Sequence, residues 1–544
     1  MEYESSINPG SRGSEQFDWY ETGLSPGERK RRGHFSTPPA LVDQMLDACG
    51  YTSHADLSAI RVLDPACGSG NFLVRAARRL CQSGASNPHE MLRLIQKNLW
   101  GLDPDPVACC LAEMQLRSVV AAFSGTNPRL ARMHIHQADS LTLPWYPCVD
   151  LLVANPPYLA AKNTDLSRYR RAQQRGQTDS YLLFLDLALQ AVRPGGWIGL
   201  VLPDPVLARS NAVAERVSLL STCTLHHIWH LSGVFEAEVG AVVVIARKLP
   251  PRTLHRISWT RTRWRKDLEP VRPEQSAQPG QRVSQLLLAR QPDSALRYLL
   301  STPQGRIVER LRRSLCLTEQ LVPEQKSLVL LKELVSIKRG EELGRNSSAL
   351  GLLTIQPDAY PVLRGGVDIR PYARPETALG ISRSAINKPL ERYLLPKLLV
   401  VKSTGSLQAA LDTRGHVVLQ TLYLLHVHEQ DATLDLAYFL LALLNSRFLR
   451  AYVYHLHTAY KLVQPQIEQI VLARLPVPWC DPELRQEISA RAREMERICS
   501  AAGSVVEWDK QLKAFYEEQE RAISALYTAA LSKTCNDEGV TSHV

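Results

Sequence analysis

The chain has 544 residues, of which 45% are hydrophobic and 22% charged, and its 64 lysines and arginines outnumber its 54 acidic residues by ten. This composition is typical of globular proteins and excludes collagen-like, coiled-coil and fully disordered chains. No stretch approaches the roughly 18–20 uninterrupted apolar residues of a membrane-spanning helix, and the first residues do not resemble a secretory signal. Eleven scattered cysteines, none in a Cys-x-x-Cys pair, indicate free thiols in a reducing cytosol. We therefore expect a cytoplasmic protein of several domains without a metal site.

The positive charge is unevenly distributed along the chain. Residues 1–250 carry a net charge of +1, residues 251–480 carry +13, and residues 481–544 carry −4. This distribution predicts that a nearly neutral part performs chemistry while a basic part holds a polyanion such as a nucleic acid. On charge alone, a basic solvated surface without such a partner is an equally good interpretation.

In chain order, residues 1–32 are polar and end in a basic run, which predicts a flexible arm. Residues 33–250 alternate short apolar runs with helix-like stretches, as in an α/β domain with a doubly wound, mostly parallel sheet. The expected strands are Ile60–Leu63, Leu99–Leu102, Met133–Gln137, Leu151–Ala154, Trp197–Leu202 and Ala241–Ala246, and helices are expected at Phe72–Ser83 and Pro106–Ala122.

Three further segments follow residue 250. Residues 251–327 are basic and rich in Pro and Gln, and we expect a linker with bridging helices near Arg282–Leu300 and Arg306–Leu317. For residues 328–480 we expect a second globular unit of mixed α/β structure. Residues 481–544 predict a helical hairpin or one long helix, followed by a frayed tail.

A glycine-rich turn follows the first expected strand in the sequence Asp64-Pro65-Ala66-Cys67-Gly68-Ser69-Gly70. Glycine lets the backbone adopt positive φ and approach a ligand closely, so a ligand site is expected at this strand end. The turn is not a phosphate-binding P-loop, because no Gly-Lys-Ser/Thr follows. The carboxylate of Asp64 would repel phosphate and suits a cationic ligand, although a purely structural turn is the simpler alternative.

Acidic residues also follow the next two expected strands. Asp103 is placed to accept hydrogen bonds from ribose hydroxyls, and Asp139 to accept one from an adenine amino group. Each acid alone is more often a surface or capping residue. Their succession at strand ends favours an adenosine site.

The most specific motif is Asn155-Pro156-Pro157-Tyr158, directly after the expected strand Leu151–Ala154. The two prolines fix the backbone and remove two N–H donors. The side-chain oxygen of Asn155 and the carbonyl of Pro156 remain as acceptors that could hold one planar NH₂ group. Tyr158 adds a ring on which a planar base or amide could stack.

Together these motifs resemble the N6-adenine DNA methyltransferases of the gamma arrangement, in particular the Taq-type enzymes of restriction–modification systems. The segment Gly33-His34-Phe35-Ser36-Thr37-Pro38-Pro39 is similar to their N-terminal cofactor motif, and Leu231–Phe235 is similar to the segment that carries a second stacking aromatic, here Phe235. Residues 328–480 resemble, more loosely, the target-recognition domains of these enzymes and of type I specificity subunits.

The resemblance implies a class I methyltransferase domain over residues 33–250, a DNA target-recognition domain over residues 328–480, S-adenosylmethionine as cofactor and double-stranded DNA as partner. It also implies that a target adenine is flipped out of the duplex for methylation at N6. A cognate restriction endonuclease or defence-system subunit would be a further partner, in the cytoplasm of a prokaryote. The implied catalytic residues are Asn155, Pro156, Tyr158 and Phe235, the implied cofactor-binding residues are Thr37, Asp64, Ala66, Gly68, Gly70, Asp103, Asp139 and Asn155, and the expected DNA contacts are Lys338, Arg339, Lys402, Arg447 and Lys461.

Other methyltransferases share Asn-Pro-Pro-Tyr, namely those that act on a glutamine side-chain amide in release factors or on guanine in ribosomal RNA. Their substrates also present a planar NH₂ group, so the motif alone does not separate the classes. They usually lack an appended basic domain of this size, and the nearly 300 residues beyond position 250 therefore favour DNA.

Overall fold

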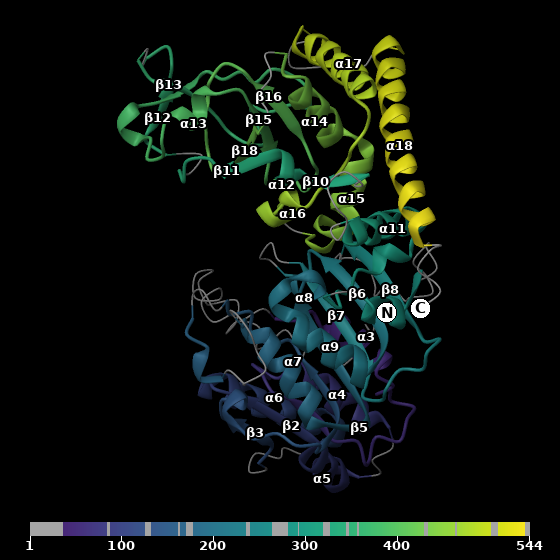
Figure 1. The fold of residues 1–544 in the computed structure, drawn as a ribbon. Coiled ribbons are helices and arrows are strands. Elements are labelled where there is room, and N and C mark those ends of the chain that lie inside the picture. Colours follow the sequence, from purple (N-terminus) through teal and green to yellow (C-terminus); the bar gives the residue numbers. More distant parts are fainter. Residues whose placement is uncertain are drawn as a thin grey trace, which may run out of the picture. The chain divides into compact units, whose positions relative to one another are not determined.

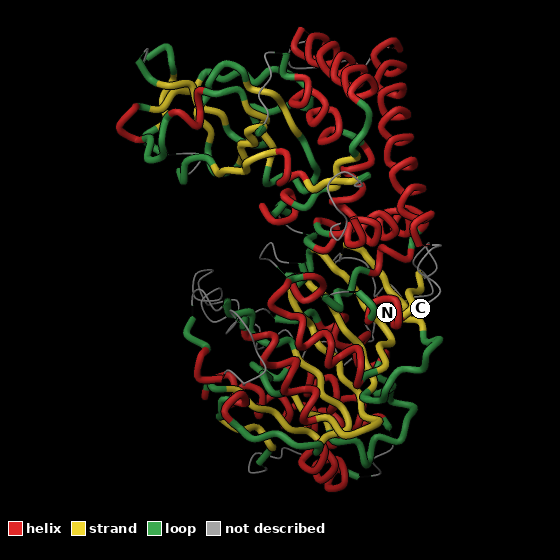
Figure 2. The backbone as a smooth tube through the Cα atoms, in the orientation of Figure 1, coloured by secondary structure: helices red, strands yellow, loops and turns green. Residues whose placement is uncertain are grey.

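The computed structural model describes residues 36–83, 87–125, 132–160, 164–169, 178–235, 240–263, 281–291, 293–318, 327–343, 347–355, 358–428, 433–462, 465–501 and 510–538. The chain divides into two compact units, which meet in the sequence between Tyr298 and Leu299. Figures 1 and 2 show a sheet with helices in the first unit, and smaller sheets with long helices in the second. Each unit is described by itself below.

The first unit is built on a nine-stranded sheet in the order β3-β2-β1-β4-β5-β7-β6-β8-β9. The first five strands of this order run parallel, while β7 is antiparallel to both of its neighbours and β9 is antiparallel to β8. The strands are β1 (Val62–Asp64), β2 (Leu99–Asp103), β3 (His134–Gln137), β4 (Val149–Ala154), β5 (Val192–Pro203), β6 (Thr224–Ser232), β7 (Ala241–Arg247), β8 (Arg256–Arg263) and β9 (Gln281–Ser284). The predicted doubly wound, mostly parallel sheet is confirmed.

Both faces of the central strands β4 and β7 are buried, which explains why these strands lack polar alternation. Leu151 and Val153 of β4 belong to one hydrophobic core together with residues of α3, α4 and α6. Because successive side chains of a strand point to opposite faces, Leu152 and Ala154 face the other side, where they are also fully buried. By their mutual contacts the helices form two groups. One contains α3 (Pro39–Ala48), α4 (Asn71–Gln82), α5 (Pro88–Asn98) and α6 (Pro106–Ser124), and the other contains α7 (Ser180–Ala191), α9 (Val213–Thr222) and α10 (Gln285–Ala289).

The expectation of a linker beginning at residue 251 is corrected by β8 and β9, which belong to the large sheet. The helix expected near Arg282–Leu300 is also wrong over most of its length, because Gln281–Ser284 pairs with β8 and only Gln285–Ala289 is α-helical there. β8 alternates apolar Ile257 and Trp259 with polar neighbours in a basic sequence, which masked its strand pattern. The other predicted domain boundaries stay predictions.

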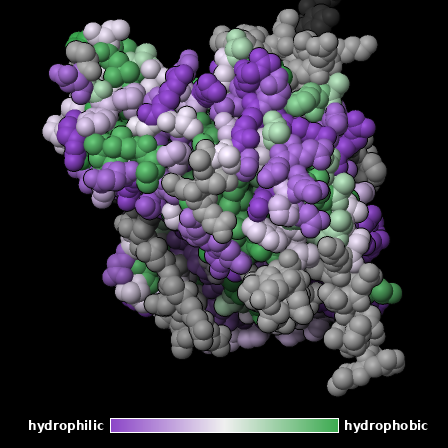
Figure 3. Space-filling view, turned by 45° about the horizontal axis from the view of Figure 1, so that its top comes forward, coloured by the Kyte–Doolittle hydropathy of each residue, from purple (hydrophilic) through white to green (hydrophobic). Residues whose placement is uncertain are grey.

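One helix of the described residues, α6, is long and apolar enough to cross a membrane by length and composition alone, with a mean hydropathy of 1.3 over Pro106–Phe123. This helix contacts α4, α5, β2 and β3 of the large sheet. Its apolar sequence is therefore accounted for by packing within the first unit. Figure 3 shows a face on which hydrophilic side chains surround smaller hydrophobic areas.

The second unit contains two four-stranded sheets, of order β11-β18-β15-β16 and β12-β14-β13-β17, and the pair β10-β19. Its main core joins the first sheet to helices, and a smaller core lies between the two sheets. The strands are β10 (Leu328–Leu330), β11 (Val335–Arg339), β12 (Leu350–Leu352), β13 (Tyr360–Leu363), β14 (Leu379–Ile381), β15 (Lys397–Val401), β16 (Ala409–Asp412), β17 (Val417–Val418), β18 (Leu422–Val427) and β19 (Pro476–Pro478), and the longer helices are α11 (Pro303–Thr318), α14 (Asp435–Asn445), α15 (Arg447–Leu456), α17 (Pro482–Ala501) and α18 (Lys510–Glu538).

Candidate active site

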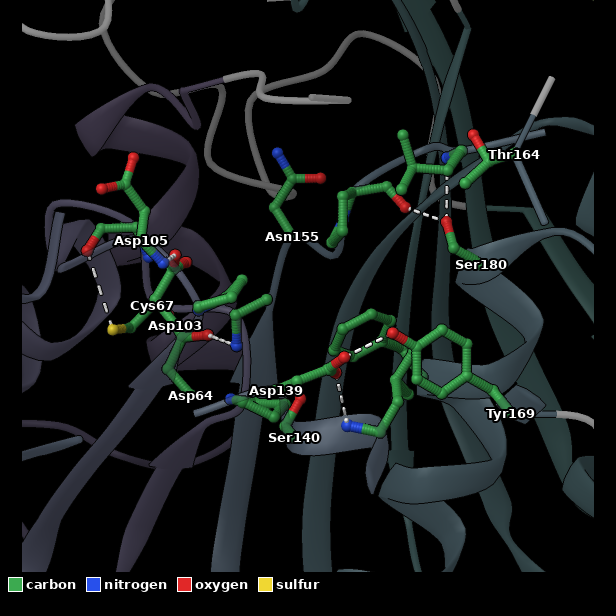
Figure 4. A pocket seen from close by; sticks show the side chains of 18 of the residues that line it. Asp64, Cys67, Asp103, Asp105, Asp139, Ser140, Asn155, Thr164, Tyr169 and Ser180 are labelled. Carbon is green, nitrogen blue, oxygen red and sulfur yellow. Dashed lines mark hydrogen bonds between the residues drawn. The ribbon is translucent and has the colours of Figure 1, made fainter. Parts of the chain in front are cut away.

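A cavity of about 710 Å³ opens at the carboxyl ends of β1, β2 and β4. Its position follows from the fold, because ligands of open parallel sheets bind beside the carboxyl ends of the strands. Figure 4 shows acidic side chains from three strand ends around Asn155. The cavity is lined by seven of the eight predicted cofactor-binding residues, which are Thr37, Asp64, Ala66, Gly68, Asp103, Asp139 and Asn155.

The eighth, Gly70, is not among the lining residues and lies close to α6. It precedes α4 with a φ of +98°, a conformation that side chains rarely adopt. A Cβ atom added to Gly70 would lie 3.0 Å from the Cβ of Ala112 in α6. Gly70 therefore allows α4 and α6 to pack closely beside the cavity, and its predicted contact with a ligand stays a prediction.

Asp103 ties the glycine-rich turn to the end of β2. One oxygen of its carboxylate accepts a hydrogen bond from the Gly68 N–H at 3.0 Å, and the other accepts one from the Asp105 N–H at 2.9 Å. Asp103 is 3% exposed and lines the cavity. Its carboxylate therefore both holds the glycine-rich turn in place and borders the cavity.

Asp64 lies at the end of β1 and accepts a hydrogen bond from the Ala66 N–H at 3.1 Å. It is 1% exposed, and burial raises its pKa to about 8, with a further contribution from the negative charge of Asp103. A buried carboxyl group of this kind becomes ionised when a cation is placed beside it. The electrostatics of this end of the cavity therefore favour a positively charged ligand.

Asp139 is held by groups from its own turn and from a distant segment. Its carboxylate accepts hydrogen bonds from the Leu141 N–H at 3.2 Å and from the Tyr169 hydroxyl. The Arg168 guanidinium lies 3.7 Å from the same carboxylate and 4.5 Å from the centre of the Tyr169 ring. Residues 164–169 thus form a wall of the cavity that sequence reasoning did not predict, because nothing in their pattern indicates a contact with Asp139 (Figure 4).

Asn155 lines the cavity at the end of β4, but the predicted stacking aromatics do not. Pro156 is buried. Tyr158 packs against the hydrophobic core that contains Phe235, and the two rings meet edge to face with centroids 6.2 Å apart. The structure therefore brings these two aromatic side chains together beside the motif, while their stacking on a base stays a prediction.

Sequence reasoning missed several other residues of the cavity. Ser36 accepts a hydrogen bond from the Asn71 side chain at 2.8 Å, which joins the segment before α3 to the start of α4. Ser180 and Phe184 of α7 also line the cavity. Nothing in the sequence predicts the position of Ser180, because a sequence does not show which loop a helix N-terminus contacts. Residues Gly33, His34 and Phe35 of the N-terminal motif lie outside the described residues.

The five cations expected to contact DNA all belong to the second unit, but their surroundings differ. Arg447 is paired with Glu517, at 3.0 Å between Nη1 and Oε2, and Lys461 is paired with Glu468 at 2.8 Å. Lys338 and Arg339 are exposed on β11, an edge strand, and Arg339 donates to the uncharged side chain of Gln469 at 3.2 Å. Lys402 follows β15 and is half-buried. The charge of Arg447 and Lys461 is thus already compensated within the protein.

Comparison with protein families identifies both parts of this arrangement. Residues 17–250 match the family described as N-6 DNA methylase, and residues 361–477 match the TaqI-like C-terminal specificity domain. The second match lies within the second unit, and the first covers most of the large sheet and every residue of the cavity named above.

Curated relatives and a solved structure agree with these matches. The type II methyltransferase M.BstVI of Geobacillus stearothermophilus is 26% identical over 235 residues, which is 40% of this chain and 42% of that protein. The type II methyltransferase M.XhoI of Xanthomonas vasicola is 30% identical over 188 residues, which is 32% and 34% of the two chains. The chain thus matches less than half the length of these relatives. The type IIL restriction-modification enzyme MmeI, solved in complex with DNA, has a similar fold with a TM-score of 0.62, 12% identity, and coverage of 96% of this chain and 79% of that one.

Proposed function

Because residues 17–250 belong to the N-6 DNA methylase family and residues 361–477 form a TaqI-like C-terminal specificity domain, we propose that this chain is a site-specific, adenine-specific DNA methyltransferase. It transfers a methyl group from S-adenosylmethionine to N6 of an adenine that is flipped out of double-stranded DNA. Methyltransferases that act on the alternative substrates, an RNA guanine or a glutamine amide, usually lack an appended domain of this size, which favours DNA.

The observation that carries this proposal is the position of Asn155. Its side chain lines the same cavity as Asp64, Asp103 and Asp139, the acids at the ends of β1, β2 and β3. An amide oxygen at this place can accept a hydrogen bond from an amino group at the edge of the cofactor space. A methyl donor and an NH₂ acceptor would therefore meet at the end of β4.

The residues of the cavity fit S-adenosylmethionine by their chemistry. Its volume of about 710 Å³ lies within the range of roughly 300–1,000 Å³ that is usual for ligand sites. Buried Asp64 favours a positive charge, Asp103 offers carboxylate oxygens to ribose hydroxyls, and Asp139 offers them to an adenine amino group. When bound, S-adenosylmethionine supplies an activated methyl group on a positively charged sulfur.

In this mechanism the protein mainly orients the reacting groups and excludes water. The Asn155 oxygen and the Pro156 carbonyl accept hydrogen bonds from the target amino group, which draws the nitrogen lone pair out of conjugation with the ring. Tyr158 and Phe235, which already contact each other, turn their rings toward the extruded base. Catalysis then rests on positioning and electrostatics, without a covalent enzyme intermediate.

DNA is held by the basic surfaces of the chain. Of the net charge of +13 carried by residues 251–480, residues 251–298 of the first unit contribute +6 and residues 299–480 of the second contribute +7. Each unit therefore contributes net positive charge to the attraction of DNA. Lys338, Arg339 and half-buried Lys402 supply phosphate contacts, whereas Arg447 and Lys461 contribute little because glutamates already neutralise them.

The biological setting follows from the relatives. The curated relatives M.BstVI and M.XhoI are type II methyltransferases, and MmeI is a restriction-modification enzyme. We place this chain in a prokaryotic restriction–modification or phage-defence system in the cytoplasm, with a cognate endonuclease or defence subunit as its further partner.

The test is methyl transfer from tritiated S-adenosylmethionine to duplex DNA, ribosomal RNA and protein in parallel, followed by mass spectrometry of the modified product. We expect N6-methyladenine in DNA as the product. Incorporation into RNA or protein, with none into DNA of diverse sequence, would contradict the proposal.

A further inference from the structure

Ser180, the first residue of α7, makes three hydrogen bonds to the segment Pro157–Leu159. Its hydroxyl donates to the Pro157 carbonyl and accepts from the Leu159 N–H at 2.8 Å, and its own N–H donates to the Leu159 carbonyl at 3.0 Å. Ser180 is 1% exposed and also lines the cavity (Figure 4). The hydroxyl thus satisfies an acceptor within the Asn155 motif, the Pro157 carbonyl, and a donor directly after it, the Leu159 N–H.

This anchor lies within two residues of both predicted acceptor groups. Pro156 and Pro157 have fixed φ angles, so the backbone between Asn155 and the anchored carbonyl has few remaining degrees of freedom. A restraint on the Pro157 carbonyl is therefore transmitted to the Pro156 carbonyl and to the Cα of Asn155. Without the hydroxyl, the polypeptide from Pro157 to Leu159 would lose two of its three hydrogen bonds to α7.

The start of α7 is itself held in place. Asp179, the residue before Ser180, is 8% exposed, and its carboxylate accepts a hydrogen bond from Arg209 at 3.1 Å. Arg209 ends the short helix α8 (Pro205–Ala208), which follows β5. The anchor of the motif is thereby connected to the neighbouring strand of the sheet and does not depend on α7 alone.

We propose that Ser180 is a positioning residue for methyl transfer, whose hydroxyl fixes the backbone at Pro157 and Leu159 and thereby the acceptor geometry at Asn155 and Pro156. The proposal rests on the proposed function, because it assigns the acceptors to the target amino group. It does not require Ser180 to touch the substrate.

The test compares Ser180→Ala, Ser180→Val and Ser180→Thr in the full chain, since threonine keeps the hydroxyl that the nearly isosteric valine lacks. Ser221→Ala is the control, because exposed Ser221 on α9 also donates to a backbone carbonyl, that of Val217 at 2.8 Å. Three quantities are measured: kcat with duplex DNA, the Kd for S-adenosylhomocysteine, and hydrogen exchange of the peptide that contains the Leu159 amide.

We expect alanine and valine to lower kcat by about ten- to a hundredfold, since small displacements of a positioning group have effects of this size. The Kd should stay near the wild-type value, the Leu159 amide should exchange faster, and threonine should restore both kcat and protection. Wild-type kcat in Ser180→Ala, or a loss of kcat with unchanged Leu159 exchange, would overturn the proposal.

Failure of the proposed function is recognised separately, because the wild-type protein would then methylate no DNA. In that case the hydrogen-exchange measurement alone decides whether Ser180 anchors the segment. Unchanged protection of Leu159 in Ser180→Ala would overturn the anchor itself.

Discussion

The hydroxyl of Tyr169 donates a hydrogen bond to the carboxylate of Asp139, although the two residues are 30 positions apart and belong to different walls of the cavity. This contact lies within one site and brings the segment 164–169 over the end of β3. The pKa of Tyr169 is raised there, first through partial burial and then through the hydrogen bond to the carboxylate.

Tyr169→Phe removes this donor while keeping the ring. We expect the affinity for S-adenosylmethionine to fall about fivefold. A hydrogen bond to a charged partner contributes roughly 1.5–3 kcal/mol when it is fully shielded from water, and the effect is smaller here because the Tyr169 side chain is half-buried. Isothermal titration calorimetry measures the Kd directly. Tyr146→Phe, at a side chain that is 67% exposed, is the matched control, and equal affinities of the two variants would contradict the role of Tyr169.

If the proposed function holds, Asp64 should make the binding of S-adenosylmethionine depend on pH. Its pKa is raised to about 8 by burial, so the carboxyl group is mostly protonated at pH 7 in the free protein. A cation favours the ionised form, so binding lowers the pKa, and the affinity for S-adenosylmethionine should increase as the pH rises toward 8.

The corresponding measurement is proton release at pH 7, obtained from calorimetric titrations in buffers of different ionisation enthalpy. The wild-type protein should release a proton on binding, and Asp64→Asn should release fewer. The raised pKa of Asp64 also affects stability. Between about pH 4 and about pH 8 the unfolded chain has lost this proton while the folded protein still holds it, so the free energy of unfolding falls as the pH rises. Equal proton release in both proteins would show that Asp64 does not titrate on binding.

The packing of α4 against α6 predicts that alanine substitutions at two glycines change the free energy of unfolding by different amounts. Gly70 and Gly125 both have positive φ, but an added Cβ at Gly70 meets Ala112 at 3.0 Å, whereas one at Gly125 meets nothing within 4 Å. We expect Gly125→Ala to cost about 1 kcal/mol of unfolding free energy and Gly70→Ala about 2–3 kcal/mol, because the second adds overpacking to the backbone strain. Denaturant unfolding compares them, and equal losses would contradict the close packing.

The pairing of cations in the second unit predicts which of them contact DNA. Replacing Lys338 and Arg339 together by Gln should weaken DNA binding and lower the slope of log K against log[salt] by about 0.9 for each phosphate that is no longer neutralised. Replacing Arg447 and Lys461 together by Gln should leave the slope nearly unchanged, because Glu517 and Glu468 already compensate them. Fluorescence anisotropy over a salt series measures both slopes, and a larger decrease for the second pair would reverse the assignment.

Much of the fold of the first unit is predictable from the sequence, because the signals for its strands and for the acids at their ends are local. The strands β1, β2, β4, β5 and β7 contain short apolar runs. Asp64 and Asp103 are the last residues of β1 and β2, and Asp139 lies two residues beyond β3. Parallel pairing then brings these acids to one edge of the sheet.

The remaining features depend on contacts between distant residues. Tyr169 on Asp139 and Ser180 on Pro157 join segments whose separation in the sequence gives no periodic signal. β8 and β9 were expected as linker because their composition is basic, although they extend the sheet. A glycine at position 70 is typical of a turn that binds a ligand. Its close packing against Ala112 becomes visible only when the position of α6 is known.

Methylation-sensitive long-read sequencing of DNA from a host that expresses the protein tests the central claim most directly. Wild-type protein should place N6-methyladenine at one defined sequence throughout the host DNA, and Asn155→Ala, with cofactor binding retained, should place none. Host DNA without N6-methyladenine at any defined sequence, or an unchanged pattern with Asn155→Ala, would contradict adenine methylation through the Asn155 acceptor.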